Sequence, residues 1–579
     1  MKNFIFLFLS SVCLSIYLNA ETPTKNYPKP LDFSNISVQG ELLTRAQKNF
    51  DRLEEENYLP ENVFPVKHDT SSIGWPGDKE GRTILCLVLE AQATHREPKY
   101  LAEMITKLPE KVNKMGYLGP VLKDSIMEQQ LSGHGWFLRG LCEYYEWKQD
   151  PKVKEYIKNI IQNLALPTMG EHKKYPIDPQ SRKINVGEIA GTIQDTLGKW
   201  MLSSDIGCDF IFMDGVIHAY KLFPSDELKQ LVEEMLDRFF EMDLMAIKAQ
   251  THASLTAIRG ALRYYEITRQ PRLLEESEKR YKLYREMAMT EHYQNYNWFE
   301  RPEWTEPCAI VDSYMAAVQL WQFTGKQEFL EDAHHIYYNG ICHTQRFNGG
   351  FGCDNCPGPV NNNIEIRVNE AYWCCTMRGG EGLARAVQYN YFIDSDTLFI
   401  PFFNNSAAAF TINDRKIKLE QTSLYPFDGK VILKVIDAEP SDTITLKFIA
   451  LSWTKNHRLL INNKPVEAGL NNGFLSYKTK LQKDDVIEFT FDMKSGVSEM
   501  MNKKHSRQGY IKLFYGPLIL GYEGRNEITI NKDTEIVKED NNRFTIKGAQ
   551  VTLSPVYHLL DSKVWKEKDY KKQILFKAN

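Results

Sequence analysis

The sequence lacks two features that would place it in a membrane or on nucleic acid. Beyond its first twenty positions it has no apolar run of roughly 20 residues, the length that a membrane-spanning helix requires. It also has no block of basic residues, and its net charge is −4, which argues against nucleic acid as a partner. We therefore expect no stable membrane insertion and no nucleic-acid binding.

The first twenty residues have the composition of a secretory signal peptide. Lys2 supplies a positive charge, residues 4–18 are mostly apolar, and Ala20 precedes the polar Glu21. This pattern predicts a signal peptide at residues 1–20 and an exported protein, periplasmic or extracellular. Its removal takes Cys13 from the ten cysteines and leaves nine, an odd number that cannot pair completely in internal disulfides. In an oxidising compartment, the remaining thiols need burial, a metal or a function.

Five segments repeat one pattern, in which an apolar helix end and a short polar turn lead into a new helix. The equivalent positions are Ala91, Tyr144, Ala219, Tyr264 and Leu320, a spacing of roughly 50 residues that is typical of stacked helical hairpins. Pro98, Pro151 and Pro271 recur where a proline suits a first helical turn. With one less regular terminal unit, six hairpins would close into an (α/α)6 toroid. An open solenoid is the alternative, but solenoids usually repeat more uniformly.

The character of the sequence changes after about residue 386. Segments such as KVILKVIDAEPSDTITLKFIAL alternate apolar and polar residues between turn signals, which predicts antiparallel strands. A chain of 579 residues is expected to form two or three domains. We predict an α+β multidomain protein with a toroid followed by antiparallel β-sandwich domains. The expected units are a segment at 21–40 packing on the β part, the toroid at 41–386, a sandwich at 387–500 and a β-rich domain at 501–579.

Two cysteine-bearing segments carry the chemical signal. Residues 305–309 read TEPCA and residues 373–382 read WCCTMRGGEG, with GCDNC at 352–356 between them. Glu306, Cys308, Cys374 and Cys375 would supply the four ligands that Zn²⁺ favours. Adjacent cysteines are unusual in structural zinc sites, whose ligands are normally two to four residues apart. A zinc-held thiolate would be ionised and able to act as a nucleophile.

Other interpretations of these cysteines remain open at this point. Cys374 and Cys375 would form a vicinal disulfide if no metal bound them. Cys353 and Cys356 would form a disulfide, a second zinc half-site or a pair of buried thiols, and we favour a disulfide or another structural role.

The Glu-x-Cys and Cys-Cys elements, on a toroid followed by sandwiches, resemble glycoside hydrolase family 127, the retaining β-L-arabinofuranosidases with a zinc-bound cysteine nucleophile. The segments YPFDGKVILKV and YGPLILGYEG also resemble the β domains of this family. The resemblance implies Glu306, Cys308, Cys374 and Cys375 as zinc ligands and Cys374 as the nucleophile. It further implies His134, in SGHGWFLRG, and His252, in THASLTAIRG, at the sugar.

The remaining site residues are less closely specified. The family places a glutamate about 16 residues before the Glu-x-Cys glutamate, and Glu291 matches with one deletion; Glu300 and Glu303 are alternatives as the general acid and base. Asp78, in the loop sequence WPGDKEGR, is either a substrate-binding residue or part of a hydrogen-bonded turn. Two departures, the TMRGG that follows the cysteine pair and the CDNC element, indicate a divergent subfamily and leave the exact sugar open.

The sequence thus predicts an exo-glycosidase that acts on terminal β-L-arabinofuranosyl or related pectic residues of a glycan, with Zn²⁺ as cofactor. A toroid-type polysaccharide lyase is one rival, but it leaves the cysteines unexplained. A non-catalytic glycan-binding protein with structural zinc is another, and it predicts binding without turnover.

Overall fold

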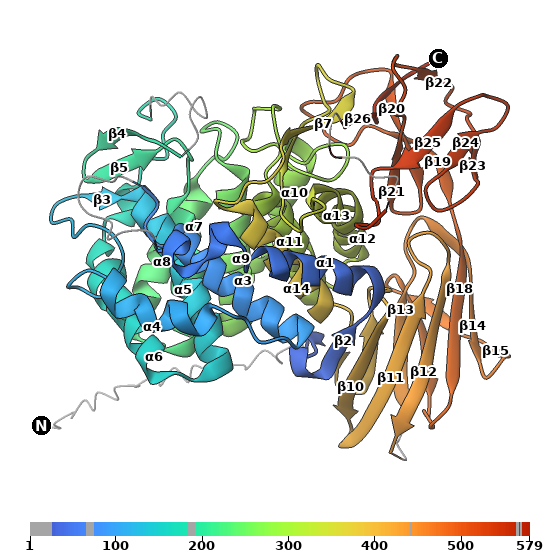
Figure 1. Ribbon diagram of the computed structural model, residues 1–579, viewed down its shortest axis with the longest axis horizontal. Coiled ribbons are helices and arrows are strands. Elements are labelled where there is room, and N and C mark those ends of the chain that lie inside the picture. Colours follow the sequence, from blue (N-terminus) through green and yellow to red (C-terminus); the bar gives the residue numbers. More distant parts are fainter. Residues whose placement is uncertain (1–25, 65–73, 183–190, 440–442, 563–566, 568–569) are drawn as a thin grey trace, which may run out of the picture.

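Six helices form a closed inner ring in the computed structural model, which describes residues 26–64, 74–182, 191–439, 443–562, 567 and 570–579. They are α3 (Asp78–Thr94), α5 (Glu128–Lys148), α7 (Asp209–Leu222), α9 (Thr251–Thr268), α11 (Pro307–Thr324) and α14 (Cys375–Gln388). Each packs on the next, and α14 returns to α3 (Figure 1). The ring is closed, so the open solenoid is excluded. The predicted signal peptide at 1–20 lies outside the described residues.

An outer layer of six helices covers this ring. It consists of α1 (Gly40–Arg52), α4 (Leu101–Lys111), α6 (Pro151–Ile160), α8 (Asp226–Glu241), α10 (Pro271–Met287) and α12 (Gln327–Ile336). The five predicted turns each join an inner helix to its outer partner. Pro151 and Pro271 are the first residues of their helices, whereas Pro98 lies just ahead of α4. Short helices α2 (Pro60–Val63) and α13 (Cys342–Thr344) lie in the connections. The predicted (α/α)6 toroid is confirmed.

The inner helices approach each other closely and share buried charges. A Cβ atom on Gly215 of α7 would lie 2.4 Å from the carbonyl oxygen of Gly135 of α5, so glycine permits this crossing. Arg139 of α5 pairs with Asp214 of α7 at 2.6 Å. Because unpaired buried charges are costly, such ion pairs fix how adjacent inner helices are placed.

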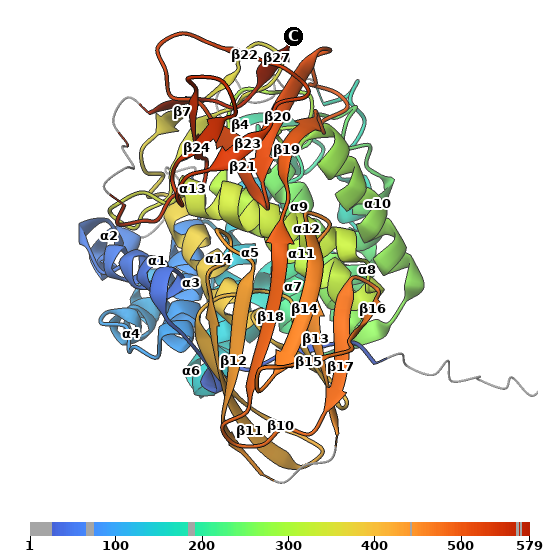
Figure 2. The same ribbon diagram turned by 90° about the vertical axis from the view of Figure 1, so that its right-hand side faces the viewer.

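Two sheets of mostly antiparallel strands form the sandwich (Figure 2). One has the order β1 (Lys29–Pro30), β8 (Phe392–Asp394), β9 (Thr397–Ile400), β13 (Ile444–Ile449), β17 (Phe474–Thr479) and β16 (Gly469–Asn471). The other has the order β15 (Lys464–Val466), β14 (Thr454–Ile461), β18 (Val486–Met493), β12 (Lys430–Ala438), β11 (Arg415–Ser423), β10 (Ser406–Ile412) and β2 (Ile36–Val38). The N-terminal segment thus supplies an edge strand to each sheet.

The C-terminal part forms a further sheet, which packs beside the toroid (Figure 1). Its strands are β19 (Ser495–Glu499), β20 (Tyr510–Tyr515), β21 (Leu518–Gly521), β22 (Thr529–Ile530), β23 (Ile536–Lys538), β24 (Phe544–Ile546), β25 (Thr552–Pro555) and β27 (Phe576–Ala578). From the same part, β26 (Lys571–Gln573) pairs with β7 (Asn363–Val368), which pairs with β6 (Cys353–Asn355). This pairing anchors the loop that contains Cys353.

A small sheet precedes helix α7. It joins β3 (Ile126–Met127), β5 (Trp200–Ser203) and β4 (Ile193–Leu197), and the chain runs from β5 through Asp205 into α7. The described helices include none that combines the length and the apolar character needed to cross a bilayer.

Candidate functional site

The inner helices all begin at the same end of the toroid, since each returns through an antiparallel outer helix. A cavity of about 480 Å³ lies at this end. Its lining includes residues at or just before the first turns of the inner helices: Asp78, Asp205, Gln250, His252, Glu306, Cys374 and Cys375. Helix N-termini carry partial positive charge, so the ring directs several positive dipole ends toward the cavity.

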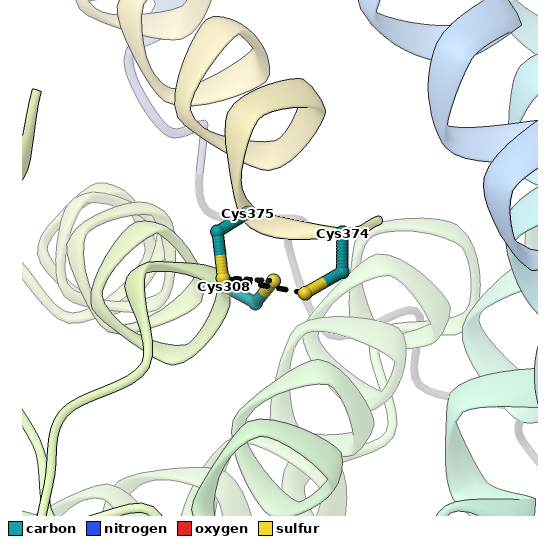
Figure 3. A group of neighbouring side chains, drawn as sticks. All are labelled: Cys308, Cys374 and Cys375. Carbon is teal, nitrogen blue, oxygen red and sulfur yellow. Dashed lines mark hydrogen bonds between the residues drawn. The ribbon is translucent and has the colours of Figure 1, made fainter. Parts of the chain in front are cut away.

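The thiols of Cys308, Cys374 and Cys375 lie close together (Figure 3), and Cys374 and Cys375 line the cavity. Cys374 is the N-cap of α14, Cys375 is its first residue, and Cys308 is the second residue of α11. The sulfur of Cys375 lies 3.3 Å from that of Cys374 and 3.6 Å from that of Cys308. Two short sequence motifs 66 residues apart in the chain (Cys308 to Cys374) are thereby brought together by neighbouring inner helices.

The three thiols differ in exposure. Cys308 and Cys375 are buried, whereas Cys374 is half-buried and lines the cavity. A hydrogen bond with Cys308 lowers the pKa of Cys374, but Cys375 and burial raise it to a value well above that of an ordinary thiol. Burial raises the pKa of Cys308 and of Cys375 as well. Without a cation, the cluster is a set of neutral thiols.

Glu306, the N-cap of α11, is the carboxylate nearest to this cluster in sequence. One of its oxygens lies 3.4 Å from Nδ1 of His252, and the other, Oε2, is buried without a hydrogen-bond partner. Two groups of metal-ligating atoms occur here, each within 4.8 Å: Cys308 with Cys374 and Cys375, and Cys308 with Glu306 and His252. Three soft sulfur donors, a carboxylate oxygen without a partner and an imidazole form a donor set that fits Zn²⁺.

His252 occupies a position between the cluster and the core. Its other nitrogen, Nε2, lies 3.3 Å from Asp312, and its ring stacks on Trp136. Burial by itself lowers the pKa of His252, but Glu306 and Asp312 outweigh it and raise the pKa. His252 lines the cavity, so its placement agrees with a role at the substrate or the metal.

Cys353 and Cys356 do not form the disulfide that the sequence favoured. All nine described cysteines are free thiols, so the disulfide is excluded, and the alternatives of buried thiols or another structural role stay open for this pair. Cys353 is held at the start of β6, lines the cavity and hydrogen-bonds with Cys375. Cys356 is directed instead toward the carbonyl oxygen of Asn295, at 3.7 Å. The pair is split between two environments because the strand turns one residue toward the cavity.

Asp78 and His134 have different fates in the structure. Asp78, the first residue of α3, lines the cavity and binds the guanidinium of Arg82 at 2.8 Å and 2.9 Å. His134 lies well inside α5, is fully buried, and bonds the backbone nitrogen of Leu118 and the carbonyl of Gln130. The structure therefore does not bring His134 to the cavity, and its ring instead holds the loop before α5.

Glu291 also lies away from the cavity. Its carboxylate accepts hydrogen bonds from the backbone nitrogens of Met501 and Asn502 and pairs with Lys512 at 2.8 Å. It is 1% exposed, and both oxygens are occupied by groups of the C-terminal β part. The expectation that Glu291 serves as acid and base is not met by this position, because a fixed offset in sequence does not determine which way the loop turns.

The two alternative glutamates, Glu300 and Glu303, also form ion pairs outside the cavity. Glu300 pairs with Lys504 at 3.0 Å and Glu303 pairs with Arg301 at 2.6 Å. Neither is among the residues that line the cavity.

Asp205 is a cavity residue that the sequence analysis missed. It lies four residues before α7, 8% exposed. Glu306 is the residue directly before α11, so Asp205 and Glu306 both precede an inner helix but at different offsets, and no sequence motif indicated Asp205. Its properties are considered below.

The aromatic lining completes the cavity. Trp75, Trp304 and Trp373 contribute indole rings, and Trp373 is 49% exposed. The side-chain oxygen of Asn297 is buried in the same lining without a hydrogen-bond partner. Indole faces, of which that of Trp373 is exposed, together with unpaired acceptors suit a ligand that has both apolar CH faces and hydroxyl groups.

Comparisons with known proteins agree with this description. The family model described as "Beta-L-arabinofuranosidase, GH127 middle domain" matches residues 397–493, within the sandwich. A solved GH127 β-arabinofuranosidase superposes with a TM-score of 0.73 at 15% identity, covering 96% of this chain and 98% of that one. A GH127 β-L-arabinofuranosidase from Geobacillus stearothermophilus T6 superposes with a TM-score of 0.69 at 13% identity, covering 94% and 100%.

A third solved structure, named only as a glycoside hydrolase, gives a TM-score of 0.70 at 13% identity and covers 96% of this chain and 98% of that one. A search of curated protein sequences finds no match. The resemblance to family 127 inferred from the cysteine motifs is confirmed at the level of the fold and of the middle domain, and the low identities fit a divergent relative.

Proposed function

We propose that this chain is an exported retaining glycosidase that removes terminal β-L-arabinofuranosyl or related pectic sugar residues, with Cys374 as a zinc-bound nucleophile. The observation that carries the proposal is the meeting of three thiols and Glu306 at the helix N-termini around one small cavity. The likeness to family 127 supports the reaction class, and the signal-like residues 1–20 support export.

The cavity size favours the removal of terminal residues. A volume of about 480 Å³ accommodates a small ligand and lies in the usual range for ligand-binding pockets. A long chain bound along an open cleft would need more room. The three indole rings provide faces for a sugar ring, while Asn297 and Gln250 offer polar atoms to its hydroxyls.

Glu306, Cys308, Cys374 and Cys375 would hold the zinc ion, which when bound keeps thiols ionised at neutral pH and shields them from oxidation. Cys374 is the thiol of the three that is not fully buried, so it can reach the substrate. Its position as the N-cap of α14 adds the favourable field of a helix N-terminus to a developing or resting thiolate. Arg82 Nη1 lies 3.3 Å from the sulfur of Cys308 and adds positive charge.

In the first step, the sulfur of Cys374 attacks the anomeric carbon. A carbon–sulfur bond forms as the glycosidic carbon–oxygen bond breaks, and the leaving oxygen takes a proton from a general acid. In the second step, water attacks the same carbon, gives its proton to the conjugate base, and releases the thiolate. Two displacements retain the anomeric configuration.

The proposal is tested with mature protein and p-nitrophenyl β-L-arabinofuranoside, with and without a zinc chelator and a reductant. We expect turnover that chelation abolishes, with about one zinc per chain by elemental analysis. Bound zinc without turnover would indicate that the substrate is another sugar. Absence of both zinc and turnover would contradict the proposal. An unsaturated, ultraviolet-absorbing product would favour a lyase instead.

A further inference from the structure

The proposed reaction needs a proton donor that none of the predicted glutamates supplies. Among the described residues that line the cavity, the carboxyl groups are those of Asp78, Asp205 and Glu306. Asp78 is engaged by two nitrogens of Arg82. Glu306 belongs to a group of metal-ligating atoms and contacts His252. By elimination, Asp205 is the carboxyl group that has neither a cationic partner nor a place among the metal-ligating groups.

The immediate contacts of Asp205 hold it in place but leave one oxygen unused. Its backbone nitrogen donates to Oγ of Ser203 at 3.1 Å, and its carboxylate accepts a hydrogen bond from the backbone of Gly191. The other oxygen, Oδ1, is buried and has no hydrogen-bond partner. A buried carboxylate oxygen without a donor is costly in its charged form, so this arrangement favours the protonated acid.

The electrostatic surroundings act in the same direction. Burial raises the pKa of Asp205 to about 7, and the nearby carboxylates of Glu306 and Glu128 add to the rise, while Gly191 and His252 oppose it. A catalytic acid that must also act as a base works best when its pKa lies close to the operating pH. The electrostatics thus support what the contacts already indicate.

We propose that Asp205 is the general acid and base of this enzyme, acting in the cavity that Cys374 and Cys375 also line; the proposal rests on the glycosidase function proposed above. In the first step, the proton on the carboxyl of Asp205 moves to the glycosidic oxygen as the bond to the anomeric carbon breaks and Cys374 bonds to that carbon. In the second step, the Asp205 carboxylate takes a proton from water as the water oxygen displaces the sulfur. Both groups then have their starting protonation.

The test compares leaving groups in the zinc-loaded Asp205→Asn and Asp205→Ala variants. An acid is needed most when the leaving group is poor, so we expect a loss of about 10²–10⁴-fold on an arabinofuranosyl disaccharide. On the 2,4-dinitrophenyl arabinofuranoside, bond cleavage should stay rapid and produce a burst, because this leaving group needs no proton. Added azide, a nucleophile that needs no base, should restore turnover in the alanine variant and yield an arabinofuranosyl azide of retained configuration.

Asp195→Asn is the matched control, since Asp195 is an exposed aspartate on neighbouring strand β4. It should keep wild-type rates on both substrates, and circular dichroism should show that the Asp205 variants are folded. Equal losses of activity on both substrates without azide rescue would overturn the acid–base role of Asp205 and leave the glycosidase proposal standing. Wild-type rates in both Asp205 variants would have the same consequence. If the wild-type protein turned over no arabinofuranoside at all, the underlying glycosidase proposal would be overturned, and the acid–base role with it.

Discussion

The two ends of the toroid both contain a cavity, but they treat charge in opposite ways. The cavity at the C-terminal ends of the inner helices is larger, about 770 Å³ against about 480 Å³. Two of its carboxylates are already paired with cations of the fold, Glu143 with Arg385 at 2.5 Å and Glu146 with Lys221 at 3.4 Å. At the cysteine end, Asp205, Asn297 and Glu306 each keep a buried oxygen without a partner.

This difference indicates where chemistry can occur. Carboxylates that are already paired within the fold contribute to its stability, whereas a buried carboxylate oxygen without a partner can still bind a substrate or a metal. Cavity volume alone would have selected the wrong end of the toroid.

The largest expected effect concerns the nucleophile. Cys374→Ser should lower turnover of the aryl arabinofuranoside by about 10³-fold or more, because the serine hydroxyl is a much weaker nucleophile. Glu146→Gln at the opposite end should stay within about twofold of wild type, since its partners there do not face the substrate. Steady-state kinetics on the two variants measures the contrast. Full activity in a zinc-loaded Cys374→Ser protein would exclude the thiolate mechanism.

A second effect separates the two ends by metal content. Glu143, Glu146 and His218 also bring ligating atoms within 4.8 Å, so the opposite end has the residue types of a metal site. We expect one zinc per chain, lost in Cys308→Ser and kept in His218→Asn, because Arg385 and Lys221 already pair with the carboxylates at the opposite end. Elemental analysis after dialysis gives the answer. Zinc lost from His218→Asn and kept in Cys308→Ser would reverse the assignment.

A third effect is in the pH dependence. Because Asp205 has a pKa of about 7 and must be protonated to donate, kcat/KM on a poor leaving group should fall about tenfold per pH unit above that value. In Asp205→Asn, the pH profile of kcat/KM should lack this decrease above pH 7.

The same group affects stability with a definite sign. The pKa of Asp205 is raised from 3.8 in the unfolded chain to about 7 in the folded one. Between these two pKa values the folded state therefore binds more protons than the unfolded state. The contribution of Asp205 to the free energy of unfolding consequently decreases as pH rises from 4 to 7. Asp205→Asn should flatten this slope in denaturant titrations. A slope that is unchanged in the variant would show that Asp205 is ionised in the folded protein throughout this range.

The sequence predicted some parts of the molecule well, for local reasons. Turn residues and helix caps, such as Asp150 before Pro151, act within a few positions, so the hairpin repeat and the toroid could be inferred. Glu306, Cys308 and the Cys374–Cys375 pair lie at helix starts, and closing the ring brings them together. The proposed acid–base residue could not be predicted in this way, because its assignment depends on contacts between remote parts of the chain. Glu291 is bound by the backbone at Met501, which no pattern near residue 291 announces.

The smallest expected effect on turnover is that of a substitution at Glu291, and it tests whether Glu291 has a structural or a catalytic role. Glu291→Gln removes the ionic partner of Lys512, whose ammonium is buried beside it, and breaking a buried pair costs about 3–5 kcal/mol. The midpoint of urea unfolding should therefore fall clearly, while turnover per folded molecule and its dependence on the leaving group stay within about twofold of wild type. The opposite result would be a selective loss of activity on poor leaving groups without loss of stability. The loop that contains Glu291 would then have to turn its carboxylate toward the substrate, and the position of Glu291 in the sequence relative to Glu306 would have predicted its role better than the observed contacts.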